Sequence, residues 1–214
     1  MNVTKTIEES SLLAAAAVPL ILLFTQIIAA PFYPGYSFSE QSVSMLGTHF
    51  SRHPWVFNLG EILTGVAALI GSVGFFFAFR RRAHVLIAGL IAFAVACLGI
   101  LSIKAGMFPM PDPRHNSWGL LQNFILVLPH LFLVGLWRER RRRALQIFLV
   151  LCVAVMFLLG PLSSRLGRGT LQRLINSATL LPVGVVGFAF WRDRRGEPPH
   201  SALIIKTDPP LRAS

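Results

Sequence analysis

Charged residues are scarce in this sequence of 214 residues: they make up 14% of the chain, against 54% hydrophobic residues. Soluble domains carry about 25% charged residues, so the composition excludes an ordinary soluble protein and indicates an integral membrane protein. Acidic residues are the scarcer kind, nine against twenty Lys and Arg, which gives a net charge of +11. The basic residues stand mostly in short Arg clusters between apolar runs. That pattern is typical of membrane topology signals, so we expect no nucleic-acid partner.

Cysteine is almost absent as well. Cys97 and Cys152 both fall inside apolar runs, which excludes a disulfide framework and a cysteine-based zinc site. His49 and His53 have the helical spacing of a metal pair, but they lack a nearby Cys or acid, so we expect no metal and no cofactor. The sequence also lacks the Walker A, Rossmann glycine and HExxH patterns. No secretory signal is predicted, because the first apolar run is too long for one and lacks a convincing cleavage site.

What the sequence does have is six long apolar runs. At about 1.5 Å per residue, each is long enough to cross a hydrocarbon core of about 30 Å. The runs cover about residues 12–30, 55–79, 83–103, 118–137, 144–162 and 171–191. The sequence therefore predicts an all-α, polytopic membrane protein with a bundle of six transmembrane helices. Residues 1–11 are predicted to form a polar cytoplasmic lead, and the Pro-rich residues 192–214 a disordered cytoplasmic tail.

The orientation of the bundle follows from the Lys and Arg residues near the span ends. The larger set is Lys5, Arg80, Arg81, Arg82, Arg138, Arg140, Arg141, Arg142, Arg143, Arg192, Arg194 and Arg195. The smaller set is Arg52, Lys104, Arg114, Arg165, Arg168 and Arg173. Because short loops rich in Lys and Arg stay in the cytoplasm, both termini are predicted to be cytoplasmic.

Polar residues inside the predicted spans gather in the outer half. Such residues at membrane depth usually face a protein interior or a water-filled cavity. Asn58 and Glu61 are three residues apart and share a helix face, while Asn116, Asn123 and His130 recur every seven residues. We therefore expect an outward-facing polar pocket. The candidate ligand-binding residues are Ser44, Asn58, Glu61, Lys104, His115, Asn123 and Arg173.

Two interpretations of these residues stay open. The structural one pairs Glu61 with Arg173 or Lys104 and uses the asparagines for hydrogen bonds between helices. The functional one is a membrane protein that binds a lipid headgroup or a small polar ligand, with membrane lipids as partners. An alternative is an interfacial hydrolase or transferase, in which Ser44 is the nucleophile, His115 the base and Glu61 the orienting group. The sequence does not show whether these three side chains meet.

Three short motifs, each at the outer end of a predicted span, resemble those of a known family. The first is Val43-Ser44-Met45-Leu46-Gly47 with Phe57-Asn58, Gly60 and Gly65; the second is Gly106-x-Phe108-Pro109 with His115; the third is Gly169-x-x-Gln172-Arg173. In this order they resemble the six-span bacterial and archaeal family called domain of unknown function 998, over residue 12 to about 191. The pattern is also distantly similar to the DRAM/Sfk-like family, which is linked to lipid handling; Met45 stands where an acidic residue is common there. The resemblance implies a six-span fold in the bacterial cytoplasmic (inner) membrane and no established reaction.

Overall fold

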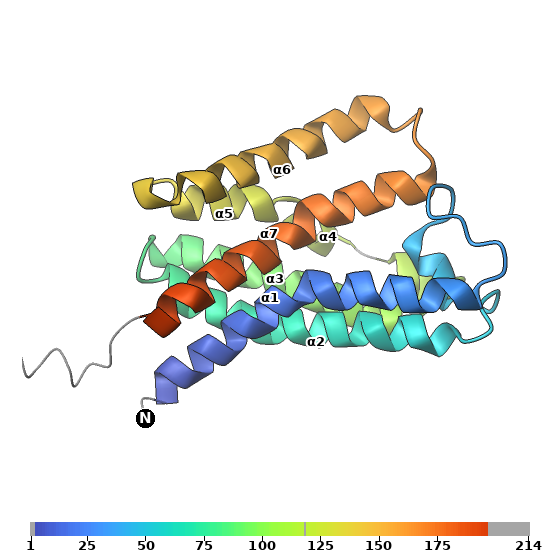
Figure 1. The fold of residues 1–214 in the computed structure, drawn as a ribbon, viewed down its shortest axis with the longest axis horizontal. Coiled ribbons are helices and arrows are strands. Elements are labelled where there is room, and N and C mark those ends of the chain that lie inside the picture. The colour runs from blue at the N-terminus through green and yellow to red at the C-terminus, as the bar shows by residue number, and fades with distance from the viewer. Residues whose placement is uncertain (1–2, 118, 197–214) are drawn as a thin grey trace, which may run out of the picture.

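The computed structural model describes residues 3–117 and 119–196, and within these ranges its regular structure is entirely helical (Figure 1). The α-helices of this part are α1 (Val3–Ala29), α2 (Pro54–Phe79), α3 (Val85–Met107), α4 (Leu121–Leu126), α5 (Leu128–Leu136), α6 (Arg143–Leu162) and α7 (Arg168–Gly196). Short 3-10 helices join them: η1 (Ala30–Phe32), η2 (Val43–Gly47), η3 (Pro113–Asn116) and η4 (Arg140–Arg142). The all-α prediction is confirmed. The predicted tail is described only as far as Gly196, where α7 ends; residues 197–214 lie outside the described residues.

Five helical segments of the described chain are long and apolar enough to cross a membrane. They are Val3–Phe32, Pro54–Phe79, Val85–Met107, Arg140–Leu162 and Arg168–Gly196. The predicted fourth span differs, because residues 121–136 form the two short helices α4 and α5 with a break at Val127. Pro129 explains the break, since proline lacks an N–H and its ring clashes with the carbonyl four residues earlier. The structure thus supports a polytopic membrane protein with five long helices and one broken segment.

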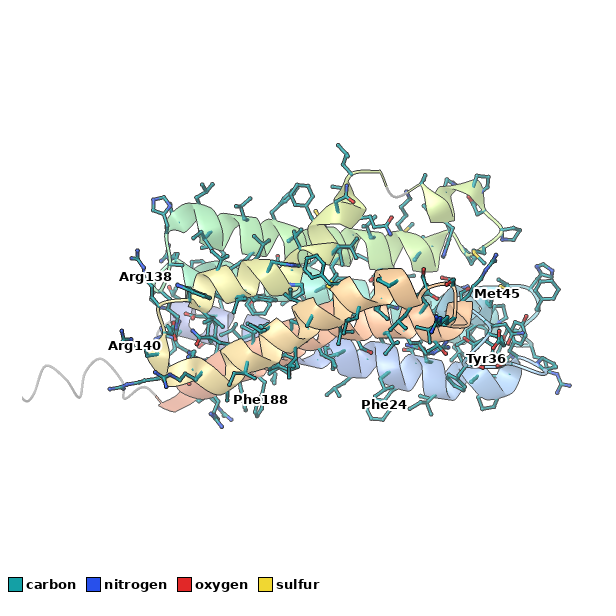
Figure 2. The ribbon with its side chains drawn as sticks, turned by 90° about the horizontal axis from the view of Figure 1, so that it is seen from above. Phe24, Tyr36, Met45, Arg138, Arg140 and Phe188 are labelled. Atoms are coloured by element: carbon teal, nitrogen blue, oxygen red, sulfur yellow. The ribbon has the colours of Figure 1, made fainter. Side chains whose placement is uncertain are left out.

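The two ends of the bundle differ in character. Figure 1 shows that α1 begins and α7 ends at the same end of the molecule. Arg138 and Arg140 lie at that end in Figure 2, whereas Tyr36 and Met45 lie at the opposite end. We call the first the basic end, which carries residues 80–84 and 137–142, and the second the loop end, which carries residues 30–53, 108–117 and 163–167.

Glycines allow the long helices to pack closely. A Cβ on Gly65 of α2 would lie 2.5 Å from the carbonyl oxygen of Gly99 on α3, and a Cβ on Gly71 would lie 2.8 Å from Cβ of Ala15 on α1. A Cβ on Gly187 of α7 would lie 2.9 Å from the same Ala15 atom. Helices in membranes gain most of their association from such close van der Waals packing. The central helix α1 is therefore held between α2 and α7.

The half of the bundle nearer the basic end has an aromatic core. Phe75 and Phe79 of α2, Phe132 of α5 and Phe190 of α7 are fully buried. The ring of Phe79 lies 5.8 Å from that of Phe132 and 5.0 Å from that of Phe190, measured between centroids. These rings fill the space between α2, α5 and α7.

Ion pairs close the basic end. Glu8 on α1 is buried and binds Arg81, and its Oε2 lies 3.3 Å from Nε of Arg194 on α7. A second group joins Arg82 and Arg142 to Glu139 and Asp193. The predicted lead of residues 1–11 is therefore part of α1 from Val3 onward. The sequence predicted these arginines as topology signals that are also compatible with lipid binding, whereas in the structure several of them connect helices.

Large apolar side chains cover the outside of the bundle. Phe24 and Phe188 point away from it in Figure 2 and are about half exposed. On α6, Phe157 is 72% exposed, and few residues of this helix are buried. Exposed apolar surface on this scale is typical of contact with lipid.

Candidate functional site

The first sequence motif forms a short helix at the loop end and the start of α2, on which that helix packs. Residues Val43–Gly47 form η2, whose Leu46 is fully buried beside Phe57. Asn58 of α2 donates a hydrogen bond of 3.1 Å from Nδ2 to the Gly47 carbonyl. This bond ties η2, which contains Ser44, to the first turns of α2. Asn58 thus holds the loop, and its side chain does not line the cavity described below.

The third motif fastens the same loop to α7. A Cβ on Gly169 would lie 2.4 Å from the Gln41 carbonyl oxygen and 2.5 Å from that of Phe38, so only glycine allows this approach. Nη1 of Arg173 donates to the Phe38 carbonyl at 2.6 Å, and Nη2 to the Tyr36 hydroxyl at 2.6 Å.

The expected partnership of Glu61 with Arg173 is therefore wrong as a direct ion pair. Among the ion pairs of the described chain, none joins these two residues. The reason is that the guanidinium already donates to backbone carbonyls, those of Phe38 and Gln41 in the loop and that of Gly169 in α7. Lys104 is not the partner either, because its Nζ binds the Ser117 carbonyl and hydroxyl, the latter at 2.7 Å.

The second motif orders another loop. His115 is buried, and its Nδ1 lies 2.9 Å from the Phe108 carbonyl oxygen. Arg114 lies over the Phe108 ring at 3.9 Å and binds Asp112. His115 is not among the lining residues of the cavity, so the described structure does not bring it together with Ser44 and Glu61.

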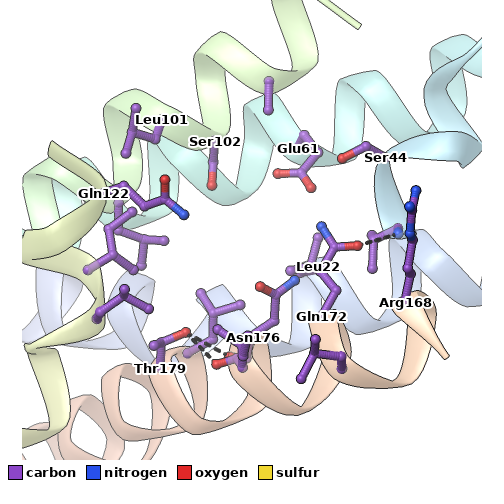
Figure 3. A pocket seen from close by; sticks show the side chains of 18 residues that line it. Leu22, Ser44, Glu61, Leu101, Ser102, Gln122, Arg168, Gln172, Asn176 and Thr179 are labelled. Carbon is purple, nitrogen blue, oxygen red and sulfur yellow. Dashed lines mark hydrogen bonds between the residues drawn. The ribbon is translucent and has the colours of Figure 1, made fainter. Parts of the chain in front are cut away.

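A cavity of about 370 Å³ lies between α2, α3, α4 and α7 in the half nearer the loop end (Figure 3). Its polar lining residues are Ser44, Glu61, Ser102, Gln122, Arg168, Gln172, Asn176 and Thr179. Its apolar lining residues are Leu22, Val43, Leu98, Leu101, Ala105, Ile125, Leu126, Leu171, Ile175 and Leu180. The volume is that of a small-molecule site.

Several polar groups on this cavity have hydrogen-bonding capacity left. Glu61 is half-buried, and its carboxylate faces the cavity beside the Ser102 side chain (Figure 3). Gln172 uses its Oε1 to accept from the Val43 N–H at 2.7 Å, which leaves its amide N–H₂ available. The side chains of Ser44, Gln122, Arg168 and Asn176 make no hydrogen bond or ion pair to any other residue that the structure describes. Gln122 and Arg168 are exposed and Ser44 and Asn176 are partly buried, so all four side chains can bond to a molecule in the cavity.

Of the seven predicted ligand-binding residues, the cavity brings together Ser44 and Glu61. Arg173 lies beside it, lining an adjacent cavity of about 240 Å³ that shares Asn176. Asn123 is exposed on α4, next to the lining residue Gln122. Whether any of the seven binds a ligand stays a prediction.

The sequence interpretation missed most of the α7 contribution. Arg168, Gln172, Asn176 and Thr179 follow each other at helical spacings of four, four and three residues, so they share one face. The sequence shows this periodicity, but the prediction selected Arg173, which does not line this cavity. Ser102 had no such signal, because its nearest neighbours in the sequence are apolar. Gln122 directly precedes Asn123, and the prediction chose Asn123 in its place.

The described residues contain no group of three or more His, Cys, Asp or Glu side chains that could hold a metal ion. His49 packs on Phe50 with ring centroids 4.1 Å apart, and His53 meets the Phe32 ring edge-on at 4.8 Å. The polar groups that line the cavity are therefore one carboxylate, one guanidinium, amides and hydroxyls. That set suits hydrogen bonding and charge recognition.

The helices and their apolar surface define an all-helical integral membrane protein. The chain belongs to the family described as "Protein of unknown function (DUF998)", whose model matches residues 15–189. This confirms the resemblance carried by the three motifs. The chain matches no curated protein and no solved structure.

Proposed function

We propose that this protein crosses the bacterial cytoplasmic membrane six times and binds a lipid headgroup or small polar ligand in the cavity at its loop end. The fourth crossing is the broken segment of α4 and α5. Both termini and the basic end face the cytoplasm, because the Arg clusters that flank α2, α6 and α7 oppose translocation. The loop end then faces outward, and the cavity lies in the outer half of the bundle.

One observation carries the binding proposal: Ser44, Gln122, Arg168 and Asn176 all face one cavity without a partner in the described chain. Gln122 and Arg168 are exposed and Ser44 and Asn176 are partly buried, so their donors and acceptors are accessible from the cavity. A bound molecule with complementary groups can therefore form several hydrogen bonds at once without displacing any contact within the protein. Nothing comparable supports the hydrolase alternative, because His115 is bound to the second loop.

The orientation is tested with reporter fusions. A reporter active only in the cytoplasm is expected to work after Arg82 or Arg143 and to fail within residues 105–117. The reverse pattern overturns the proposed orientation.

The binding proposal is tested by purifying the protein in a mild detergent and weighing it by native mass spectrometry. We expect a retained small molecule in the wild-type protein and its loss in Asn176→Leu, which fills the cavity with an apolar group. Asn123→Leu is the matched control, because Asn123 is exposed and does not line the cavity. Equal retention by the two variants contradicts a ligand site in this cavity.

A further inference from the structure

The cavity carries one charge of each sign. Glu61 is the acidic residue among its lining residues and Arg168 is the basic one. Glu61 is on α2, and Arg168 is the first residue of α7. No ion pair of the described chain joins them. In Figure 3 the Glu61 carboxylate points into the space between the helices, and Arg168 stands at one end of it. Each charge therefore lacks a partner of opposite sign in the described part of the chain.

The residues near each charge supply further hydrogen-bonding groups of the same kind, acceptors beside Glu61 and donors beside Arg168. On the side of Glu61, the Ser102 hydroxyl and the side-chain oxygen of Asn176 offer further acceptors. One turn after Arg168, Gln172 has its Oε1 bound to Val43, so its N–H₂ is free to donate. One side of the cavity thus suits a cation with several N–H donors, and the other suits an anion with several acceptor oxygens.

The cation that fits is a primary ammonium. An ammonium group has three N–H donors, which match a carboxylate and its neighbouring oxygens. Quaternary ammonium groups have no N–H and are bound by aromatic cages. None of the described residues that line this cavity is aromatic.

The anion that fits is a phosphate. Arginine recognises phosphate through several N–H groups at once, and the first turn of α7 adds the favourable end of a helix dipole. Gln172 and Ser44 supply further donors at the same end. The leucines and isoleucines along the remaining wall suit the apolar part of a lipid.

We propose that the cavity binds a molecule joining a primary ammonium to a phosphate, the chemistry of ethanolamine phosphate. This molecule is either free or the headgroup of an aminophospholipid, and the inference rests on the cavity being the ligand site proposed above. Glu61 binds the ammonium and Arg168 binds the phosphate.

The first experiment measures binding of water-soluble probes to the purified full chain by calorimetry. Ethanolamine phosphate is expected to bind at least about tenfold more tightly than choline phosphate, which lacks N–H donors, and than glycerol phosphate, which lacks the amine. Glu61→Gln, of nearly the same shape, abolishes the advantage over glycerol phosphate. Arg168→Gln weakens all three phosphates. Glu40→Gln, outside the cavity, leaves the order unchanged.

The second experiment offers the protein vesicles with equal amounts of phosphatidylethanolamine, phosphatidylcholine and phosphatidylglycerol, and identifies the retained lipid by native mass spectrometry. Preference for phosphatidylethanolamine shows that the ligand is the headgroup of a lipid. A preference seen only among the soluble probes shows that the ligand is free ethanolamine phosphate. Absence of any ethanolamine preference in both experiments overturns the inference. If Asn176→Leu still removes some other retained molecule, the proposed ligand site stands and only its ligand class is wrong. If Asn176→Leu removes nothing, the ligand site fails too.

Because Glu61→Gln could unfold the protein, its melting temperature is compared with that of the wild type. A folded Glu61→Gln variant that keeps full selectivity for ethanolamine phosphate also overturns the inference. If that variant does not fold, Arg168→Gln decides, since Arg168 is exposed and its loss does not open the core. Unchanged phosphate binding in Arg168→Gln contradicts its assigned role.

Discussion

Nδ2 of Asn58 donates a hydrogen bond to the Gly47 carbonyl at 3.1 Å, and a Cβ on Gly47 would lie 2.1 Å from Oδ1 of Asn58. The two residues of the first motif therefore need each other: the amide requires a glycine beside it, and the glycine's carbonyl requires the amide. Their contact fixes η2 on α2, which holds Ser44 at the cavity. The motif acts on the candidate site through the position of the loop.

Asn58→Ala is expected to lower the free energy of unfolding by about 1–3 kcal/mol, because it leaves the Gly47 carbonyl without its donor. Unfolding in detergent by heat or by sodium dodecyl sulfate measures the change. Asn123→Ala is the control, since Asn123 is exposed and its side chain makes no hydrogen bond to the described residues. Equal effects of the two substitutions contradict the role given to Asn58.

Gly106→Ala is expected to destabilise the protein by about 1–3 kcal/mol, because the added Cβ would lie 2.4 Å from the Asn58 carbonyl oxygen on α2. Gly89→Ala in the same helix is the control: its Cβ would meet nothing within 4 Å. That change should be neutral or stabilising by about 0.5–1 kcal/mol, from the better helix propensity of alanine. The same measurement applies, and a stable Gly106→Ala variant would show that α2 and α3 pack less closely.

Glu8→Gln is expected to cost about 3–5 kcal/mol, because Glu8 is 1% exposed and its loss leaves Arg81 and Arg194 without their carboxylate. Glu9→Gln changes the next residue, whose contact with Lys5 at 3.8 Å is at the surface, so at most about 1 kcal/mol is expected. Melting temperatures of the two variants test this difference. Equal melting temperatures of the two variants would show that the contacts of Glu8 with Arg81 and Arg194 do not stabilise the protein.

Asp112 gives a pH-dependent prediction. Hydrogen bonds from the Arg114 side chain and N–H lower the pKa of Asp112 from 3.8 to about 2. Because the folded loop favours the charged carboxylate, the contact contributes fully above about pH 4 and is lost as the pH falls toward 2. Carbon-13 NMR of labelled Asp should show a titration midpoint near 2 that moves up toward 3.8 in Arg114→Gln. Arg52→Gln should not move it, and a wild-type midpoint near 3.8 contradicts the contact.

The sequence by itself determined the class of protein. Length and apolarity of the runs decide whether a helix can cross a membrane, and both are local properties. For the same reason the basic clusters could be assigned to one end of the bundle before any contact was known. Even so, residues 118–137 were predicted as one continuous helix. Only the structure shows that the helix breaks at Val127, two residues before Pro129.

Only the tertiary structure decided which polar groups meet. Arg173 and Glu61 both lie near the loop end, yet the guanidinium binds loop carbonyls that no helix pattern placed beside it. Conversely, Ser102, Gln122 and Arg168 are far apart in sequence and lie around one cavity with Glu61. A hydrogen bond forms only when two atoms come within about 3 Å. That distance depends on how the glycine-lined helices pack and where the loops fold back, which the order of residues along a single helix does not specify.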